Sequence, residues 1–554
     1  MDYRAEYEMW KNSAKMSEKQ VEILNNMSEE EIRESFYKKL EFGTAGLRGI
    51  LGLGTNRMNE FTVSQAAYGL GRTVLDHGGE ERGVVIAHDV RHMSKEFSII
   101  TAEVLSQMGI KVYLFDDIRP TPMLSFAVKR LKTIAGVVIT ASHNPKDYNG
   151  YKVYWETGAQ ILDGIANEIL SHMYEKNIFE IETMDIEEGK KKGLVEILPH
   201  SIDEEYLQKT LDLAIHDDLD RDIKVIYTPL NGTGNKPVRE VLKRRGFKNI
   251  YIVKEQELPD PDFTTVGYPN PEDLKAFKLA EALGKEKEAD LLVATDPDCD
   301  RIALMVKDKD SYYPLNGNQM GALFTYYIFK GLKDEGRLPS NSGMVKSIVT
   351  GNMGTDMAKA MGVHTEESLT GFKNICGVAD KWDESKEYQF VFGYEESIGY
   401  CYGNHIRDKD GVISAMIAVE MAAYYKKQGK TLKDVLYDLY EEYGYYKEYL
   451  QSIVIEGEEG QKIISEMMRN LRENPHEEIA GIKVGEIFDY QKGFRNMPPS
   501  NVLIYKLSDG SWFAVRPSGT EPKIKLYIYT CEKTERASEE KLDKIKRELL
   551  SILN

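Results

Sequence analysis

The chain has 554 residues, too many for one hydrophobic core, and about 150 residues per domain predicts three to four domains. Its net charge of −18 argues against nucleic acid as the main partner, because phosphate backbones require a basic surface. Hydrophobic residues make up 42% of the chain and charged residues 29%, which is typical of soluble globular proteins. The first residues are charged, and no apolar run approaches the roughly 20 residues that span a bilayer.

The four cysteines lie far apart in the sequence and form no CxxC pair (Cys299, Cys376, Cys401 and Cys531). This spacing fits a reducing compartment and predicts neither a disulfide framework nor a zinc site. We therefore expect a cytoplasmic protein that binds neither membranes nor nucleic acids. No oligomeric state follows from the sequence.

Helical and strand patterns alternate along most of the chain, after an acidic helical segment at residues 1–40. Short apolar runs rich in β-branched residues indicate strands, and their alternation with helices predicts α/β domains with mixed or parallel sheets. Strands are expected at 83–87, 111–115, 134–139, 223–227, 290–294, 344–349, 389–392, 502–505 and 523–528, and helices at 412–428 and 534–552.

These patterns divide the chain into four expected units, which span residues 1–200, 201–310, 311–432 and 433–554. In each of the first three units a strand is followed by a polar loop and then by a helix. We therefore predict structural repetition among them, although no sequence repeat accompanies it.

The polar loop at residues 140–145 follows the apolar run 134–139 and contains Ser142. A serine at the end of a buried strand is held at the rim of a rigid sheet, where a nucleophile can meet a substrate. Lys146 and Lys152 follow closely, and cations beside a serine hydroxyl suit a phosphate better than an acyl group. The spacing is also not the GxSxG of a hydrolase.

Three aspartates at alternate positions, Asp296, Asp298 and Asp300, follow the predicted strand at 290–294. Carboxylates so spaced can converge on one cation, and oxygen-only ligands indicate a hard metal such as Mg²⁺. A calcium-binding EF-hand loop would need glycine and glutamate where this chain has Arg301 and Lys307. A solvated acidic turn is the remaining alternative.

Three further loops carry weaker signals. The loop at 516–523 offers an arginine, hydroxyls and a glycine, which can hold a phosphate but also occur in ordinary turns. The loop at 393–399 carries Glu395 and Ser397, which can bind sugar hydroxyls, although a capped helix start explains it equally well. The glycine-rich segment 42–49 contains Arg48 and by itself is more typical of a turn.

Together these five loops, in this order, resemble the α-D-phosphohexomutase superfamily over residues from about 40 to 530, and especially its phosphoglucomutase and phosphopentomutase branch. The resemblance implies an α/β protein of four domains around a central cleft. Three similar mixed-sheet α/β domains would be followed by a C-terminal α+β domain.

The resemblance also implies roles for individual residues. Ser142 would carry the transferred phosphoryl group, and one of its phosphoryl oxygens would join the three aspartates in holding one Mg²⁺ per chain. His143, Lys152 and Arg48 would act beside Ser142, and His143, Lys152 and Lys409 are the candidates for a general base. The implied substrate-binding residues are Arg301, Thr370, Gly371, Lys373, Glu395, Ser397, Lys409, Arg516, Ser518, Gly519 and Thr520.

The implied reaction interconverts glucose 1-phosphate and glucose 6-phosphate through a phosphoserine enzyme, with a sugar bisphosphate such as glucose 1,6-bisphosphate as activator and intermediate. Phosphopentomutase activity is the first alternative, followed by phosphomannomutase and glucose 1,6-bisphosphate synthase activities. Many bacterial phosphomannomutases have a histidine where this chain has Gly399, which argues against mannose phosphate. A phosphatase and a sugar-phosphate sensor are the alternatives outside the mutases.

Overall fold

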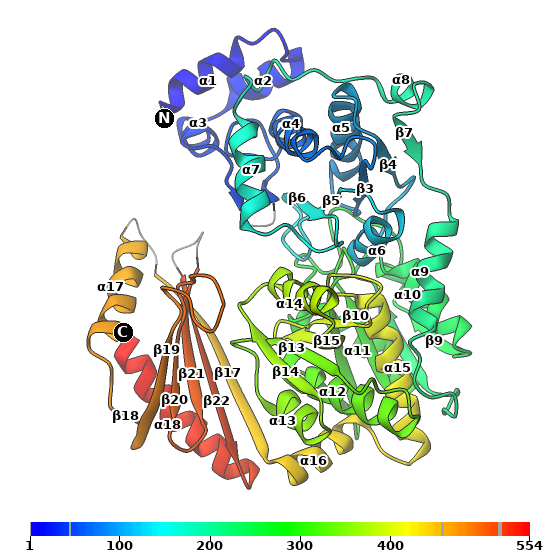
Figure 1. The fold of residues 1–554 in the computed structure, drawn as a ribbon, viewed down its shortest axis with the longest axis vertical. Helices are drawn as coiled ribbons and strands as arrows, with labels where there is room; N and C mark the ends of the chain where they lie inside the picture. The colour runs from blue at the N-terminus through cyan, green and yellow to red at the C-terminus, as the bar shows by residue number, and fades with distance from the viewer. Residues whose placement is uncertain (1, 44–45, 456–458, 519–522, 554) are drawn as a thin grey trace.

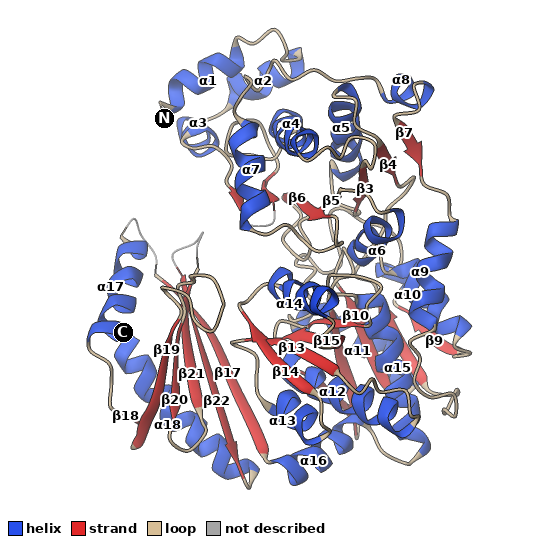
Figure 2. Ribbon diagram, viewed as in Figure 1, coloured by secondary structure: helices blue, strands red, loops and turns tan. Residues whose placement is uncertain are grey.

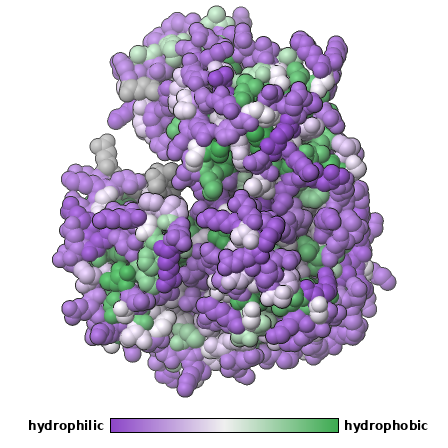
Figure 3. Space-filling view, viewed as in Figure 1, coloured by the Kyte–Doolittle hydropathy of each residue, from purple (hydrophilic) through white to green (hydrophobic). Residues whose placement is uncertain are grey.

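The computed structural model describes residues 2–43, 46–455, 459–518 and 523–553, whose strands form four separate sheets. We call the units built on these sheets domains I to IV in chain order. Figure 1 shows domain I at the top, domains II and III below it, and domain IV at the lower left. The surface is hollowed between domains I and IV (Figure 3). The predicted limits 1–200, 201–310, 311–432 and 433–554 stay a prediction.

The predicted helical segment at the N-terminus forms three helices with their own small core. Ser17 and Ser28 each begin a helix with a capping box, in which side chain and backbone satisfy each other's hydrogen bonds. Trp10 packs edge-on against Phe36, Phe61 and Phe179, and so fastens these helices to domain I. Their bounds are α1 Tyr3–Lys11, α2 Glu18–Asn26 and α3 Glu29–Phe36.

Domain I contains a seven-stranded sheet of order β1-β2-β6-β5-β3-β4-β7. Strands β3 and β5 are buried along their whole length, which explains their continuous runs of valine, isoleucine and alanine. Strand β5 pairs in parallel with β3 and antiparallel with β6. The bounds are β1 Phe42–Gly43, β2 Gly46–Ile50, β3 Val84–His88, β4 Val112–Leu114, β5 Ala135–Ile139, β6 Tyr148–Trp155 and β7 Val195–Ile197.

Domains II and III repeat the central part of this sheet. The orders β4-β3-β5-β6, β9-β8-β10-β11 and β14-β13-β15-β16 each contain two parallel pairings and then one antiparallel pairing. The predicted structural repetition is thus confirmed. The strands are β8 Lys224–Thr228, β9 Asn249–Ile252, β10 Leu291–Thr295, β11 Ile302–Asp308, β12 Ser311–Leu315, β13 Ser342–Ser347, β14 His364–Ser368, β15 Gln389–Glu395 and β16 Gly399–Tyr402.

Helices cover the sheets of domains I to III (Figure 2). No helix among the described residues is both long enough and apolar enough to span a membrane. In order, the helices are α4 Glu60–Asp76, α5 Ser94–Gln107, α6 Thr121–Leu131, α7 Asp163–Met173, α8 Ile186–Lys191, α9 Ser201–Leu211, α10 Asn235–Arg244, α11 Lys278–Lys287, α12 Gly317–Asp334, α13 Met353–Ala360, α14 Phe372–Ser385, α15 Gly411–Lys427 and α16 Leu432–Tyr443, with 3₁₀ turns at Lys254–Gln256 and Leu274–Phe277.

Domain IV is an antiparallel sheet of order β17-β22-β21-β20-β19-β18 with two helices. The helices α17 and α18 form a hydrophobic core with one face of this sheet. On the other face, Trp512 and Tyr527 pack with Val349 and Leu369 of domain III. The bounds are β17 Tyr445–Val454, α17 Gly460–Glu473, β18 Glu478–Ile479, β19 Ile482–Asp489, β20 Leu503–Leu507, β21 Trp512–Pro517, β22 Lys523–Glu532 and α18 Glu535–Leu553.

Candidate active site

Ser142 lies just beyond the end of β5, in the predicted loop. Its backbone has a left-handed φ of 52°, and its side chain is buried. The hydroxyl Oγ donates a hydrogen bond of 2.7 Å to Oδ2 of Asp296 in domain II, 154 residues away in the sequence. Nδ1 of His143 lies 3.2 Å from the same Oγ. The fold therefore brings the predicted nucleophile into contact with the predicted metal loop.

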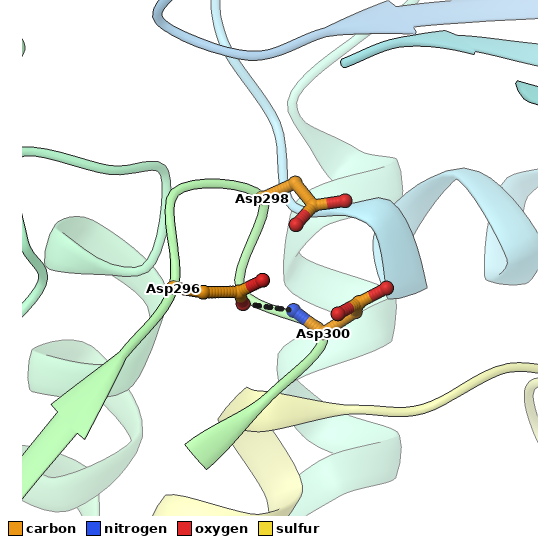
Figure 4. Close-up of side chains that lie close together, drawn as sticks. All are labelled: Asp296, Asp298 and Asp300. Carbon is orange, nitrogen blue, oxygen red and sulfur yellow. Dashed lines mark hydrogen bonds between the residues drawn. The ribbon is translucent and has the colours of Figure 1, made fainter. Parts of the chain in front are cut away.

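The three aspartates follow β10 and converge as the sequence predicts (Figure 4). One oxygen from each carboxylate lies within 4.8 Å of the others, and all three residues are buried. Oδ1 of Asp296 accepts the backbone N–H groups of Asp300 and Arg301 at 3.1 and 3.0 Å, which fixes the turn. The left-handed φ of 53° at Cys299 allows this tight loop.

The donor set fits a hard divalent cation. Oδ1 of Asp298 and Oδ1 of Asp300 are buried and have no hydrogen-bond partner. A buried carboxylate oxygen without a partner is unfavourable, because it has lost its water. A cation such as Mg²⁺ prefers such oxygen ligands and would satisfy both atoms at once. The aspartate loop can therefore hold a metal ion.

Two lysines from other domains neutralise part of this negative charge. Nζ of Lys152, on β6 of domain I, lies 2.7 Å from Asp298 and 3.3 Å from Asp300. Nζ of Lys409 in domain III lies 3.2 Å from Asp300 and 3.1 Å from Asp408. Burial alone would lower the pKa of Lys152, but Asp298 and Asp300 raise it above its usual value. Both lysines therefore meet the metal loop as cations.

The two predicted arginines and His143 border the same space. Arg48 on β2 is exposed, and its Nη1 lies 3.4 Å from Oδ1 of Asn144. Arg301 donates from Nη1 to the carbonyl of Ser397 at 3.1 Å, which links domain II to domain III. Burial, with Arg301 and Arg48 nearby, lowers the pKa of His143 well below its usual value. The imidazole is therefore neutral near pH 7.

The predicted sugar loop of domain III lies next to Arg301. The strand β15 runs two residues beyond the predicted loop start, so Glu395 is its last residue rather than part of the loop. Oε1 of Glu395 accepts the backbone N–H of Gly371 at 2.7 Å, which joins the two predicted loops of this domain. Thr370 immediately precedes Gly371. Lys373 lies 2.8 Å from Asp163 of domain I.

The predicted phosphate loop begins at the end of β21 in domain IV. Arg516 belongs to this strand, and the backbone N–H of Ser518 donates to the carbonyl of Lys523 at 2.8 Å. Gly519 and Thr520 lie outside the described residues. The strand ends at the side of domain IV that faces domain I (Figure 1). The structure thus groups the loops of domains I to III and places the start of the fourth across the hollow.

The sequence analysis missed two groups that contact the site. Thr121, at the start of α6, donates from Oγ1 to Oδ2 of Asp298 at 2.8 Å. Arg91 and Asp89 follow β3 and bind the backbone and side chain of the Ser142 loop. The rule that singled out Ser142, a polar residue directly after an apolar strand, applies equally to Asp89. That rule could therefore have identified Asp89 from the sequence.

The fold is that of known phosphohexomutase structures. Parafusin (pp63, a phosphoglucomutase) from Paramecium, in an open form, has a TM-score of 0.70 at 18% identity, and the match covers 93% of this chain and 95% of that one. A phosphoglucomutase/phosphomannomutase family protein from Burkholderia thailandensis has a TM-score of 0.69 at 18% identity, over 92% and 97% of the two chains. These similarities confirm the predicted four-domain architecture.

Sequence comparison then gives the family. Phosphoglucomutases of Staphylococcus aureus (strain COL) and Staphylococcus epidermidis (strain ATCC 12228) are 40% and 39% identical over 90% and 92% of this chain, and over 91% and 93% of their own lengths. Domain models of the phosphoglucomutase/phosphomannomutase family match in order: alpha/beta/alpha domain I at 39–178, domain II at 204–309, domain III at 316–443 and the C-terminal domain at 466–551. The chain therefore belongs to the phosphoglucomutase/phosphomannomutase family, which confirms the predicted superfamily and isomerase class.

Proposed function

We propose that this protein interconverts glucose 1-phosphate and glucose 6-phosphate through phosphorylated Ser142 and a glucose 1,6-bisphosphate intermediate. The observation that carries the proposal is the 2.7 Å contact between Oγ of Ser142 and Asp296, inside a buried cluster of three carboxylates. A serine hydroxyl beside a metal loop and two lysines suits phosphoryl transfer, which depends on positioning and charge stabilisation. The relatives named phosphoglucomutase support glucose phosphate as the substrate.

In the proposed reaction, a hydroxyl oxygen of the sugar monophosphate attacks the phosphorus of phospho-Ser142. The bond from phosphorus to Oγ breaks, and the serine oxygen regains a proton while the sugar hydroxyl loses one. Of the three candidate bases, His143 has a ring nitrogen 3.2 Å from Oγ of Ser142, whereas Lys152 and Lys409 contact carboxylates. We therefore assign to His143, by geometry, the proton that Oγ of Ser142 gains or loses, and the acceptor of the sugar hydroxyl proton stays open between Lys152 and Lys409.

Asp296, Asp298 and Asp300 would hold one Mg²⁺ per chain, which supplies positive charge next to the transferring phosphoryl group. Lys152 and Arg301 add fixed positive charge next to Asp298 and Asp300. After the first transfer the bisphosphate reorients, and its other phosphate returns to Ser142. Arg516, Ser518, Gly519 and Thr520 would hold the phosphate that does not react, while Glu395 and Ser397 would bind sugar hydroxyls.

Gly399 supports glucose over mannose phosphate. A β-carbon at this position would lie 2.3 Å from Cδ of Lys409, so a histidine here would displace the lysine that contacts Asp300. Gly399 thus leaves room for Lys409, whereas many bacterial phosphomannomutases have a histidine at the position of Gly399. Four free cysteines support the predicted cytoplasmic location.

A direct test compares kcat/KM for glucose 1-phosphate, ribose 1-phosphate, deoxyribose 1-phosphate and mannose 1-phosphate, with phosphorylation of Ser142 followed by intact mass. We expect glucose 1-phosphate to be preferred and Ser142→Ala to lose both the activity and the added mass of one phosphate. A preference for a pentose phosphate would instead assign a phosphopentomutase. Release of inorganic phosphate as the main product, seen by ³¹P NMR, would assign a phosphatase.

A further inference from the structure

We infer that Arg91 is a positioning residue for phosphoryl transfer, which holds Ser142 in its left-handed conformation through the carbonyl groups of the loop. The inference rests on the proposed role of Ser142 as the phosphoryl carrier. It concerns a residue that would touch neither the sugar phosphate nor a metal ion. Its support comes from three sets of contacts: with the loop carbonyls, with Asp89 and with domain II.

The Arg91 side chain is fully buried, and its guanidinium points into the Ser142 loop from the end of β3. Nη2 donates to the carbonyl of Ser142 at 2.6 Å and also to that of Asn144. Nη1 donates to the carbonyls of Pro145 and Tyr148 at 2.8 and 3.1 Å. The contact to the Ser142 carbonyl is buried, and a buried carbonyl needs a hydrogen-bond donor. A planar fork with five N–H groups can reach all four, whereas a lysine cannot.

Asp89 completes the support from the opposite side of the Ser142 peptide. Its carboxylate lies 3.4 Å from Nε of Arg91 and accepts a 2.6 Å hydrogen bond from Oγ1 of Thr140. Oγ1 of Thr140 in turn accepts the backbone N–H of Ser142 at 2.9 Å. One Asp–Arg pair therefore fixes both the N–H and the C=O of the nucleophile's own residue.

Domain II covers this assembly. The Arg91 guanidinium lies 5.1 Å from the centre of the Phe263 ring, which is fully buried and has a left-handed φ of 47°. The carboxylate of the adjacent Asp262 lies 3.2 Å from Nζ of Lys146, the residue that follows the serine loop. Because domain II also carries Asp296, these contacts relate the position of Ser142 to the aspartate loop. A small shift of Oγ would misalign it with the substrate phosphate, and misplacement by about 1 Å can lower a rate roughly 100-fold.

The test is Arg91→Ala, assayed with glucose 1-phosphate with and without added guanidinium chloride. We expect kcat to fall about 100-fold while KM changes less than about threefold, because substrate contacts remain. Guanidinium should restore part of kcat, and methylammonium should not, since only the planar ion can replace the fork. Thr140→Val is a milder second variant, with an expected fall in kcat of about tenfold at unchanged KM.

Arg245→Ala is the matched control. Arg245 is also largely buried and ion-paired, with Glu420 and Asp217, but it lies at the C-terminal end of α10 and its ion pairs are not with the serine loop. Its replacement should lower thermal stability and leave kcat unchanged. Equal losses of kcat in the two arginine variants, or failure of guanidinium to restore activity to a folded Arg91→Ala, would overturn the inference. If Arg91→Ala does not fold, a Thr140→Val variant with wild-type kcat would overturn the inference instead.

The proposed function is checked separately in the same experiment. Wild-type protein must first gain the mass of one phosphate on Ser142 from glucose 1,6-bisphosphate. If wild type does not, the proposed function fails whatever Arg91 does. If wild type is phosphorylated and active while Arg91→Ala keeps full kcat, only the positioning role fails.

Discussion

The loops after β5 in domain I and after β10 in domain II occupy the same place in two sheets of the same design, yet they are held in different ways. Each turns at one non-glycine residue with a left-handed backbone, Ser142 or Cys299. The aspartate loop is held partly by its own side chain, because Oδ1 of Asp296 accepts two backbone N–H groups of its own turn. Backbone N–H groups of Thr121, Thr233 and Gly411 bind its carbonyls from outside. The serine loop is held from outside, by Arg91 and Asp89 at the end of β3.

The difference follows from the chemistry of the two side chains. A carboxylate has several lone pairs, so Asp296 can cap its own loop with one oxygen and still offer the other. A serine that must accept and release a phosphoryl group cannot spend its single oxygen on the backbone. Its loop therefore takes its support from a neighbouring strand. The same scaffold thus carries the proposed nucleophile in one domain and the proposed metal loop in another, with different groups supplying the hydrogen bonds.

The largest expected effect comes from a substitution in the aspartate loop. Asp298→Asn removes one negative charge from the cluster and leaves Lys152 without its nearest carboxylate. We expect kcat/KM with glucose 1-phosphate to fall at least about 1,000-fold, roughly 4 kcal/mol of transition-state stabilisation. Steady-state assays at increasing Mg²⁺ concentrations measure kcat/KM of the variant and of the wild type. Asp310→Asn, at an exposed turn of the same domain, is the control and should keep wild-type activity. A variant at position 298 with more than about a tenth of wild-type activity would contradict the metal assignment.

The next effect comes from the residue that joins the two loops. Lys152 reaches from the domain I sheet to two carboxylates of domain II. Lys152→Met keeps most of the side chain but removes the charge, so we expect kcat to fall about 100- to 1,000-fold. Rapid-quench measurement of phosphate transfer from Ser142 checks that the loss lies in the chemical step. Lys111→Met, at an exposed ion pair with Glu81, should change kcat less than twofold or so. A pure KM effect at Lys152 would contradict the role.

The sequence predicted the strands that carry both loops, because buried parallel strands have continuous apolar runs. Expected strands at 134–139 and 290–294 correspond to β5 and β10. The resemblance to a family brought Ser142 and the aspartates together; no pattern in the residues could, since the contact spans 154 positions. Arg91 was missed for a physical reason. Its four hydrogen bonds to the serine loop and β6 go to backbone carbonyls, which every residue has, and its one paired side chain, Asp89, is a near neighbour in the chain that does not point to a distant loop.

A third substitution tests whether domain IV acts separately from the two loops. Arg516 lies in β21, and an arginine fork can bind a phosphate through two charge-assisted hydrogen bonds. We expect Arg516→Ala to raise KM for glucose 1-phosphate about 10- to 100-fold, which corresponds to about 1.4 to 2.7 kcal/mol. Phosphorylation of Ser142 at saturating glucose 1,6-bisphosphate should change much less. Arg536→Ala, an exposed arginine of α18, serves as the control. Equal effects on both measurements would contradict a role in holding the phosphate that does not react.

The smallest expected effect tests how far the aspartate loop really binds itself. Thr121 of domain I donates from Oγ1 to Oδ2 of Asp298 at 2.8 Å, and its backbone N–H donates to the Asp298 carbonyl at 2.9 Å. Thr121→Val removes only the first bond at nearly constant volume. Replacing a group that orients a metal ligand typically lowers metal affinity about 10- to 100-fold. Because Lys152 still contacts Asp298, we expect the low end, about a tenfold higher Mg²⁺ concentration for half-maximal activity, with kcat nearly restored at saturation.

Thr101→Val, a buried threonine bonded within α5, controls for the loss of a hydroxyl and should leave the Mg²⁺ dependence unchanged. The two ways in which Thr121→Val can depart from expectation have different meanings. A loss of kcat that saturating Mg²⁺ does not recover would place Thr121 in phosphoryl transfer itself. An unchanged Mg²⁺ dependence would mean that Lys152 and the loop's own hydrogen bonds suffice to orient Asp298. The aspartate loop would then need no side-chain hydrogen bond from domain I beyond that of the lysine, and its contrast with the serine loop would be sharper still.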